Sequence, residues 1–479
     1  MRNYFFIVIT IVFVASCTSG GNNEAVQPNL PVCISDTSRS AMCVYLTSDE
    51  KNNPVVSWCE TDNAGKKSFY LSFFDIVERK FSSAVDIPIE QNVSLHEEGM
   101  PKVAFKSDGG IVAVYETSLP AKQNQWAGQV RYMQSFDKGK TWTQPANIHA
   151  DTASANSHSF AAITRLSDGE IGACWLDQTY NYKKGGRPVK FASTDKQKGF
   201  ANEVLVDSLA CECCRLAIAA NAHNKVSIVY RDIINDSIRD ISISTSLNNG
   251  RTFSAPTSFS QDHWNINGCP HNGPGLVSTQ SATYAVWFTG GSLNGVYYGE
   301  LNNKNVMVEK KHLAPDGRNI QLCILSDEAR IAAYSENVRA ADSVYSRIVM
   351  DKIQSGKIFT ADITAKAAHA AYPVVTAYSK SGIVIAWTEN HRVYYKQLES
   401  QDISKEVFDP VPAASKPGTV TVTRLSMHTD PVCGMRIADD AENTISLAGK
   451  VVGFCSQSCK EKFLTDPQKY QQKLMDEKR

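Results

Sequence analysis

The stretch Ser135-Phe136-Asp137-Lys138-Gly139-Lys140-Thr141-Trp142 has the composition of a tight turn between two strands. The Asp side chain can accept hydrogen bonds from backbone N–H groups inside such a turn, and the glycine can adopt a positive φ that other residues resist. The closing Trp is expected to pack inward between neighbouring sheets. The pattern recurs as Ser246-Leu247-Asn248-Asn249-Gly250-Arg251-Thr252-Phe253, and in degenerate form between Ser193 and Phe200. Two full copies predict a repeated β structure.

A longer repeat surrounds these turns: an apolar strand, a short turn, a second apolar strand that ends in Trp or Tyr, and then a third strand. The second strands are Val55–Trp58, Ile111–Tyr115, Ile171–Trp175, Val226–Tyr230, Tyr284–Trp287, Ile331–Tyr334 and Ile383–Trp387. Their spacing of roughly 45–60 residues is that of four-stranded propeller blades. The sequence therefore predicts an all-β protein, a β-propeller of seven blades, or of six if one apparent blade is split across the termini.

The two turns resemble the Asp-box, or BNR, repeats of sialidase-like β-propellers. The resemblance implies a propeller scaffold, although sialidases themselves have six blades. It does not extend to the sialidase active site, which needs an arginine triad that begins with an Arg-Ile-Pro element. The matching segment is Gly99-Met100-Pro101-Lys102, without an arginine. Arg215 and Arg318 could supply two of the three arginines, so enzymatic activity is left open and is not favoured.

The composition limits the partners. The 479 residues include 42% hydrophobic ones, and the 49 basic residues balance the 49 acidic ones. A chain of this length can bury a sizeable core, and balanced charge argues against nucleic acid or an acidic membrane surface as the main partner.

The N-terminus reads as a secretory signal. A basic start is followed by an apolar run that is too short for a comfortable membrane span. The end of this run, Val14-Ala15-Ser16-Cys17, resembles a bacterial lipobox. The resemblance implies a lipoprotein signal peptide at residues 1–16, lipidation of Cys17 and a flexible tether at 17–29. We therefore expect a bacterial membrane lipoprotein at the periplasmic face of the outer membrane or at the cell surface; an ordinary signal peptide is the alternative.

The propeller is expected to occupy residues 30–408. A Pro/Ala-rich linker at 409–427 follows it and has a semi-rigid reach. The chain then changes character, and residues 428–479 are expected to form a separate module.

This module contains Asp430-Pro431-Val432-Cys433-Gly434-Met435 and Gly453-Phe454-Cys455-Ser456-Gln457-Ser458-Cys459. The pattern resembles the YHS domain of the TRASH-like heavy-metal group, which implies a small α+β fold and metal binding. Cys455 and Cys459 are four residues apart at the start of a helical pattern, so their sulfurs share one face. Cys433 could complete a three-thiolate site, which suits copper or zinc, with His428 or Met435 as a fourth ligand. A disulfide between two of the cysteines is the alternative.

The loops that lead into the innermost propeller strands should share one face around the central channel. They contain a second group of soft ligands: Cys211, Cys213, Cys214, Cys269 and His271. We expect them to meet at a second metal site, and a disulfide to Cys269 is the alternative. Further candidates for the channel face are His96, His158, Arg215, Arg318 and His369.

The sequence thus favours an extracytoplasmic protein that binds copper or zinc and sequesters it, senses it or delivers it to a metal-donor or metal-acceptor protein. Two alternatives stay open. One is an enzyme on the propeller face, either a glycoside hydrolase or a metal-dependent oxidoreductase. The other is a propeller that binds glycan or protein.

Overall fold

The structure is a computed structural model that describes residues 30–407 and 429–470, apart from 154, 179–184, 267, 269, 292, 327–328, 341–342, 436, 438–442, 448–449 and 456. The predicted signal peptide, tether and linker, together with Cys17, Cys269 and His428, lie outside the described residues. Within the described part, no helix has both the length and the apolar character needed to cross a membrane.

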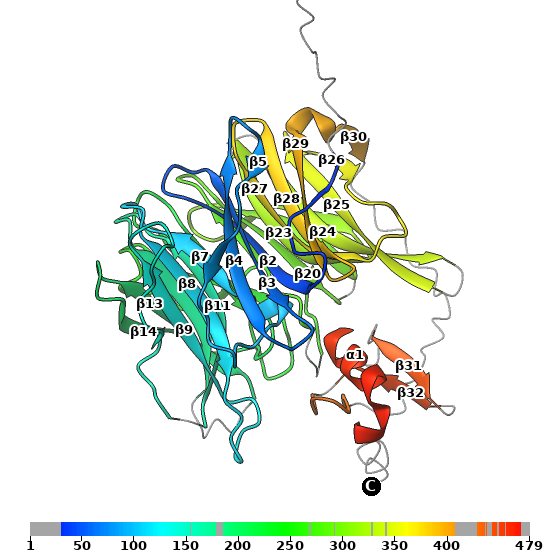
Figure 1. Ribbon diagram of the computed structural model, residues 1–479. Coiled ribbons are helices and arrows are strands. Elements are labelled where there is room, and N and C mark those ends of the chain that lie inside the picture. The colour runs from blue at the N-terminus through cyan, green and yellow to red at the C-terminus, as the bar shows by residue number, and fades with distance from the viewer. Residues whose placement is uncertain are drawn as a thin grey trace, which may run out of the picture. The chain divides into compact units, whose positions relative to one another are not determined.

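The regular secondary structure of the described chain before residue 408 consists of β-strands and two short 3-10 turns, and the strands form successive antiparallel groups (Figure 1). The first groups are β2 (Ser40–Ser48), β3 (Pro54–Thr61), β4 (Lys67–Asp75), β5 (Lys80–Phe81) and β6 (Val85–Ile87); β7 (Lys102–Phe105), β8 (Ile111–Ser118), β9 (Gly128–Ser135) and β10 (Ala146–Asn147); and β11 (Ser157–Arg165), β12 (Ile171–Gln178), β13 (Arg187–Thr194) and β14 (Phe200–Ala210). The next are β15 (Ala217–Ala220), β16 (Val226–Arg231), β17 (Ile241–Ser246) and β18 (Thr257–Ser258); and β19 (Gly275–Ser278), β20 (Thr283–Thr289), β21 (Gly295–Leu301) and β22 (Met307–Ala314). The last are β23 (Gly317–Ser326), β24 (Ala329–Ala340), β25 (Ser343–Gln354) and β26 (Lys357–Asp362) with β30 (Lys405–Val407); and β27 (Ala370–Ala377), β28 (Gly382–Glu389) and β29 (Arg392–Glu399) with β1 (Val32–Cys33). The short 3-10 turns η1 (Glu97–Gly99) and η2 (Ser400–Asp402) lie between strands.

The hydrogen-bonded sheets differ in number from the predicted blades. Among the described residues of the propeller, five separate sheets have four or five strands, as single blades do, and one further sheet has eight. The large sheet arises because β9 and β11 pair in parallel at Gly128 and Ser157, which joins two four-stranded groups. The all-β propeller is confirmed, whereas the prediction of seven, or six, separate blade sheets is not.

The innermost strands form a closed series. The first strand of each group contacts the first strand of the next, in the order β2, β7, β11, β15, β19, β23, β27 and back to β2. The N-terminal strand β1 adds to the last group through Val32 opposite Tyr395 and Cys33 opposite Tyr394. Because β1 pairs with β29 of the last group, hydrogen bonds as well as packing close the ring.

The second strand of each group forms the centre of the core. Trp58, Trp175, Trp287 and Trp387 are at most 1% exposed. Each indole N–H donates to a carboxylate, for example Trp58 to Glu60 at 2.8 Å and Trp387 to Glu389 at 2.9 Å. A buried indole needs such an acceptor, because an unpaired N–H in the core would destabilise it. The Trp that ends each apolar run is therefore a structural residue.

The turn motifs have the predicted structure. In the first, the Ser135 hydroxyl donates to Asp137 Oδ1 at 2.9 Å and accepts from Gly139 N at 2.8 Å, while Thr141 N donates to Asp137 Oδ1 at 2.8 Å. The second repeats these bonds at Ser246 and Asn248. Its glycine, Gly250, has φ +87°, and a Cβ there would lie 2.2 Å from the Phe191 ring of the preceding group. The motif thus fixes both a turn and a contact between neighbouring groups.

The C-terminal segment, coloured red in Figure 1, has its own small core. It contains a hairpin of β31 (Thr444–Leu447) and β32 (Lys450–Gly453), followed by helix α1 (Gln457–Thr465) and the 3-10 turn η3 (Pro467–Tyr470). Phe454 and Phe463 are fully buried, with ring centroids 5.2 Å apart. These rings anchor the hairpin end to the helix, and the cysteines lie at this junction.

Candidate metal centres

The three cysteines of the C-terminal segment come together. The Sγ atoms of Cys433 and Cys455 are 3.4 Å apart, and those of Cys455 and Cys459 are 3.6 Å apart. Cys459 lies in the first turn of α1 and is 8% exposed, whereas Cys433 and Cys455 are half-buried. The helix start supplies one thiol, the residue after the hairpin another and the Asp430 turn the third. This is the arrangement that the sequence predicted.

Asp430 joins these thiols and was not among the predicted site residues. It is 0% exposed, and one of its carboxylate oxygens lies within 4.8 Å of each of the three sulfurs. Its Oδ1 accepts from Val432 N at 2.8 Å and Cys433 N at 3.3 Å, and its Oδ2 accepts from Cys455 N at 2.8 Å. One carboxylate therefore fixes the backbones of two candidate ligands, Cys433 and Cys455, relative to each other. The only sequence signal was an Asp three residues before Cys433.

The sulfurs also interact with one another. Hydrogen bonding to Cys433, and then to Cys459, raises the pKa of the Cys455 thiol well above its ordinary value. Protons and a metal ion therefore compete for the same sulfurs, because thiolates are the ligands. Three thiolates suit a soft ion such as Cu(I), or Zn(II) with one further ligand. Met435, the other predicted fourth ligand, is described and half-buried.

A second thiol cluster lies in the propeller. Cys211, Cys213 and Cys214 are 4%, 3% and 2% exposed, and their Sγ atoms lie within 4.8 Å of one another. They occupy the turn between β14 and β15, and Cys211 N donates to Arg231 O at 2.9 Å. The three thiols meet as predicted. Cys269 lies outside the described residues.

His271, predicted as a ligand of that cluster, is not part of the group. Its ring lies 5.5 Å from that of His96, centroid to centroid, and both of its nitrogens are buried without a hydrogen-bond partner. His96 Nδ1 accepts from Glu98 N at 3.2 Å, and burial, with the nearby His271, lowers the pKa of His96 to about 3. A neutral ring whose Nδ1 accepts must carry its proton on Nε2. His96 is therefore a hydrogen-bond donor, and its Nε2 is not available to a metal.

Glu98, a further residue that the sequence did not single out, connects three of these loops. It is 2% exposed and accepts from Arg215 N at 3.2 Å, from the Arg215 guanidinium at 2.5 Å and from Gly273 N at 2.8 Å. Arg215 also donates to Ile320 O at 2.7 Å. Both terminal nitrogens of this buried guanidinium donate hydrogen bonds inside the protein, so Arg215 helps to fix the loops of the cysteines and of His271.

The structure places the remaining candidates elsewhere. His158 is 2% exposed, with Nδ1 3.0 Å from Asp177 and its ring stacked on His149 at 3.6 Å. His369 is exposed beside Tyr345. The Arg318 guanidinium lies over the Phe288 ring at 4.0 Å. None of the three belongs to a ligand group within the described residues.

Strained backbone marks the innermost strands. Cys43, Phe160, Asn319 and Tyr372 have φ between 53° and 59°, and each falls at a β-bulge of β2, β11, β23 or β27. Such conformations are costly for residues with a Cβ and re-aim the side chain. The bulges recur around the ring, so they are a property of the repeat.

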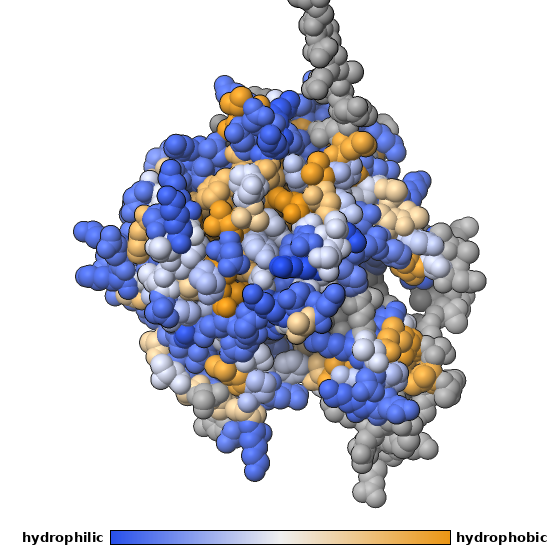
Figure 2. Space-filling model, in the orientation of Figure 1, coloured by the Kyte–Doolittle hydropathy of each residue, from blue (hydrophilic) through white to orange (hydrophobic). Residues whose placement is uncertain are grey.

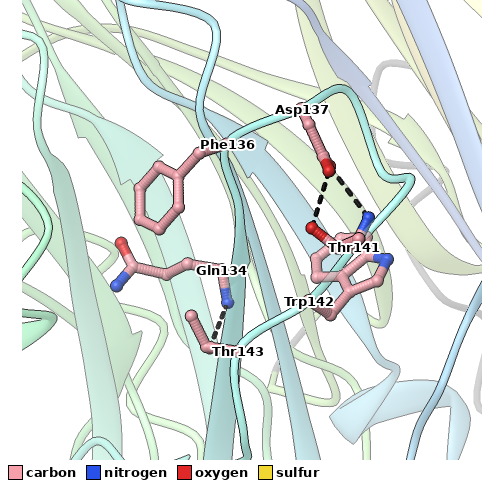
Figure 3. A pocket seen from close by; sticks show the side chains of 6 residues that line it. All are labelled: Gln134, Phe136, Asp137, Thr141, Trp142 and Thr143. Atoms are coloured by element: carbon pink, nitrogen blue, oxygen red, sulfur yellow. Dashed lines mark hydrogen bonds between the residues drawn. The ribbon is translucent and has the colours of Figure 1, made fainter.

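A surface pocket lies at the first turn motif and is lined by Gln134, Phe136, Asp137, Thr141, Trp142 and Thr143 (Figure 3). Asp137 is engaged in the turn by Thr141, and Thr143 Oγ1 accepts from Gln134 N at 3.0 Å. Its lining is therefore scaffold. The face shown in Figure 2 is mostly hydrophilic, with separate apolar patches.

Comparison with known proteins agrees with this division. The family described as BNR repeat-like domain matches residues 60–287, and the YHS domain matches residues 428–473. No curated protein matches the chain.

Similar solved structures include the NanB sialidase from Streptococcus pneumoniae, with 8% identity, a TM-score of 0.48 and coverage of 78% of this chain and 71% of that one. A polysaccharide lyase described as an ulvan lyase has 9% identity, a TM-score of 0.49 and coverage of 79% and 97%. The alpha-L-arabinofuranosidase of Fusarium graminearum has 10% identity, a TM-score of 0.44 and coverage of 78% and 98%. The family matches, together with the turn motifs and the sheet arrangement, show that the chain is a sialidase-like β-propeller with a C-terminal YHS domain.

Proposed function

We propose that this protein binds a soft metal ion, copper or zinc, through Cys433, Cys455 and Cys459 of its YHS domain. The observation that carries the proposal is the convergence of three sulfurs on the buried Asp430, with Sγ–Sγ distances of 3.4 and 3.6 Å. These distances leave the sulfurs unbonded to each other and able to surround one ion. Soft thiolates prefer such ions over magnesium or calcium.

The exposure of the site supports metal handling or delivery over permanent storage. Cys433 and Cys455 are half-buried, so a ligand from a metal-donor or metal-acceptor protein can reach the ion. A fully enclosed ion would have to wait for local unfolding.

The location follows from the sequence. We propose cleavage before Cys17, lipidation of that residue and anchoring at the extracytoplasmic side of a bacterial membrane. The Val14-Ala15-Ser16-Cys17 run after an apolar segment supports this. Such an anchor would keep the YHS domain near a membrane while the linker lets it reach a partner.

We also infer that the propeller has seven blades, with the eight-stranded sheet counted as two. The support is the closed series of seven innermost strands, and the single paired position between β9 and β11.

A second candidate function, an enzyme of the propeller face, rests on His271. An imidazole with two buried, unpartnered nitrogens beside the neutral donor His96 has the components of a proton-transfer site. Hydrolysis of a polysaccharide panel by the full chain, lost on His271→Ala, would support it, and no turnover on any member would remove it.

The main test is anaerobic titration of the full chain with Cu(I) against a chromogenic chelator. Cys459→Ser should remove one equivalent of bound Cu(I), because a hydroxyl is a poor ligand for a soft ion. Cys323→Ser is the matched control, since Cys323 is also 8% exposed but lies in no cluster. Equal binding by wild type and Cys459→Ser would refute the proposal.

A further inference from the structure

The thiols of the propeller form a cluster that the YHS domain does not account for. Cys211, Cys213 and Cys214 fall within four residues, and the Sγ atoms of Cys211 and Cys213 are 3.7 Å apart. All three are at most 4% exposed. Free cysteines are often buried singly as small apolar residues, and Cys174 at 0% exposure is an example in this chain. Three sulfurs that point at one another are a different arrangement, because each lies in the position of a ligand to a common centre.

The loop that carries them is held from outside. Cys211 N donates to Arg231 O, and the next residue after the cluster, Arg215, is locked by Glu98 through its backbone N–H and its guanidinium. The same Glu98 binds Gly273 N. The turn therefore has a fixed shape that does not depend on a disulfide, and the sulfurs are preorganised.

The charge around the cluster is unusual. Arg231 is 1% exposed, and its guanidinium donates to the carbonyl oxygens of Arg239, Asn272 and Phe288 at 2.8–3.0 Å. Its Nε has no hydrogen-bond partner, and its guanidinium lies 4.8 Å from the centroid of the Trp264 ring. A buried cation without an anion is strongly unfavourable.

The adjacent thiols are the natural source of that anion. Cys211 N donates to Arg231 O at 2.9 Å, so the turn that carries the thiols is in direct contact with Arg231. Thiolates bound to a metal ion in this turn would carry the opposite charge to the guanidinium.

We propose that Cys211, Cys213 and Cys214 bind a second soft metal ion, Cu(I), as an anionic thiolate complex whose negative charge the Arg231 guanidinium offsets in part. On binding, the thiols that become ligands release their protons to solvent, and no bond between sulfurs forms. Three soft thiolate ligands suit Cu(I). Because the sulfurs are enclosed, this ion is a resident one that exchanges only when the loop opens.

The first test isolates this site in the full chain. In a variant with Cys433, Cys455 and Cys459 all replaced by Ser, anaerobic titration against a chromogenic chelator should still show one Cu(I) per chain. Adding Cys213→Ser should abolish it, whereas adding the matched control Cys174→Ser, another buried thiol, should not. Circular dichroism melting of each variant checks folding, and Cys211→Ser replaces Cys213→Ser if the latter is unfolded.

Either of two results would overturn the proposal. One is no Cu(I) bound in the variant that lacks the YHS thiols. The other is a reduced and refolded protein whose intact mass falls by two hydrogens before it takes up metal, which would make the cluster a disulfide. If the YHS site binds no metal, the result of this experiment does not change, because the variant already lacks the three YHS thiols.

The second test concerns Arg231. Arg231→Lys keeps the charge and Arg231→Met removes it, and both lose the planar hydrogen-bonding fork. If the charge balances the complex, Arg231→Met should weaken Cu(I) binding by about tenfold or more relative to Arg231→Lys at an effective buried dielectric of about 20. Equal Cu(I) affinities of the two variants would reduce Arg231 to a structural role and refute the charge argument.

Discussion

Replacement of Asp430 by Asn tests whether this residue orients the YHS thiols. The carboxylate offers two acceptor oxygens, which bind Val432 N and Cys433 N on one side and Cys455 N on the other. Asn keeps only one acceptor, so at least one of these N–H groups must face an NH₂ group. A buried donor that loses its acceptor costs about 1–3 kcal/mol.

Loss of these hydrogen bonds should also lower the affinity of the site for metal. If the Cys433 and Cys455 backbones lose their common acceptor, the sulfurs are no longer held in one place. Loss of an orienting partner typically lowers metal affinity by about 10–100-fold. Asp466→Asn is the matched control, since Asp466 is exposed and accepts only a 3.4 Å bond from Lys469 N. We expect the control to change the free energy of unfolding by less than about 0.5 kcal/mol.

Two measurements on the full chain separate the explanations. The first is Cu(I) affinity of the YHS site, taken as the binding that Cys459→Ser removes. The second is hydrogen exchange at the Cys455 amide, read by mass spectrometry. Faster exchange together with weaker binding supports an orienting role. Weaker binding with unchanged exchange would mean that Asp430 is itself a ligand, and no change in either would refute the reasoning.

Four further predictions follow from other parts of the chain. Gly250→Ala should destabilise the propeller by roughly 1–3 kcal/mol more than Gly65→Ala in denaturant unfolding, because both glycines have positive φ but only at Gly250 would a Cβ collide with Phe191; equal losses would contradict this. Burial raises the pKa of Asp351 to about 7 in the folded protein, above that of the unfolded chain, so its contribution to stability is complete below about pH 4 and is lost as pH rises through 7. Asp351→Asn should therefore flatten the dependence of Tm on pH between 4 and 8, and an unchanged profile would contradict the assignment. A brief exposure of copper-loaded protein to a chelator should remove copper from the half-buried YHS thiols before it removes copper from the propeller thiols. Simultaneous loss of both copper ions, measured by elemental analysis, would contradict the difference in burial. Intact mass of the membrane-extracted protein should show acyl groups on a chain that starts at Cys17; a soluble chain with another start would exclude the anchor.

Much of the fold was predictable because its determinants are local and repeated. The Trp or Tyr that ends each second strand recurs at blade spacing, and an acid two residues later receives the indole N–H at Trp58, Trp175 and Trp387. The hydrogen bonds among the Ser, Asp or Asn, Gly and Thr residues of each turn motif all fall within eight residues. A pattern of this kind is visible in one sequence without any knowledge of distant contacts.

The errors have the opposite character, since they depend on contacts between distant residues. The pairing of Ser157 with Gly128 that merges two groups into one sheet has no local signal. His158, a candidate for the channel face, is buried against Asp177, a contact with a residue nineteen positions away that its neighbours in sequence do not indicate. Glu98 could not be recognised as the partner of Arg215 and Gly273, because 117 and 175 positions separate them.

The two thiol clusters offer the same donor atoms but differ in how far they are exposed to solvent. Identical ligands give similar preference for a soft ion, so affinity alone does not separate the sites. Their surroundings do. Cys433 and Cys455 are only half-buried, and one carboxylate binds the backbone N–H groups of both, so an incoming ligand could approach without disturbing the core.

Around Cys211, Cys213 and Cys214 the protein excludes water, and it leaves the charge of Arg231 to be balanced from inside. An ion there can leave only if the loop opens and a buried cation loses its counter-charge, two unfavourable events that must coincide. A protein that both carries and retains a soft ion needs this asymmetry, since two exposed sites would lose their ions to the same partner. If both clusters bind a soft ion as proposed, the exposure of each cluster, more than the identity of its ligands, would decide which ion is exchanged with a partner and which is retained.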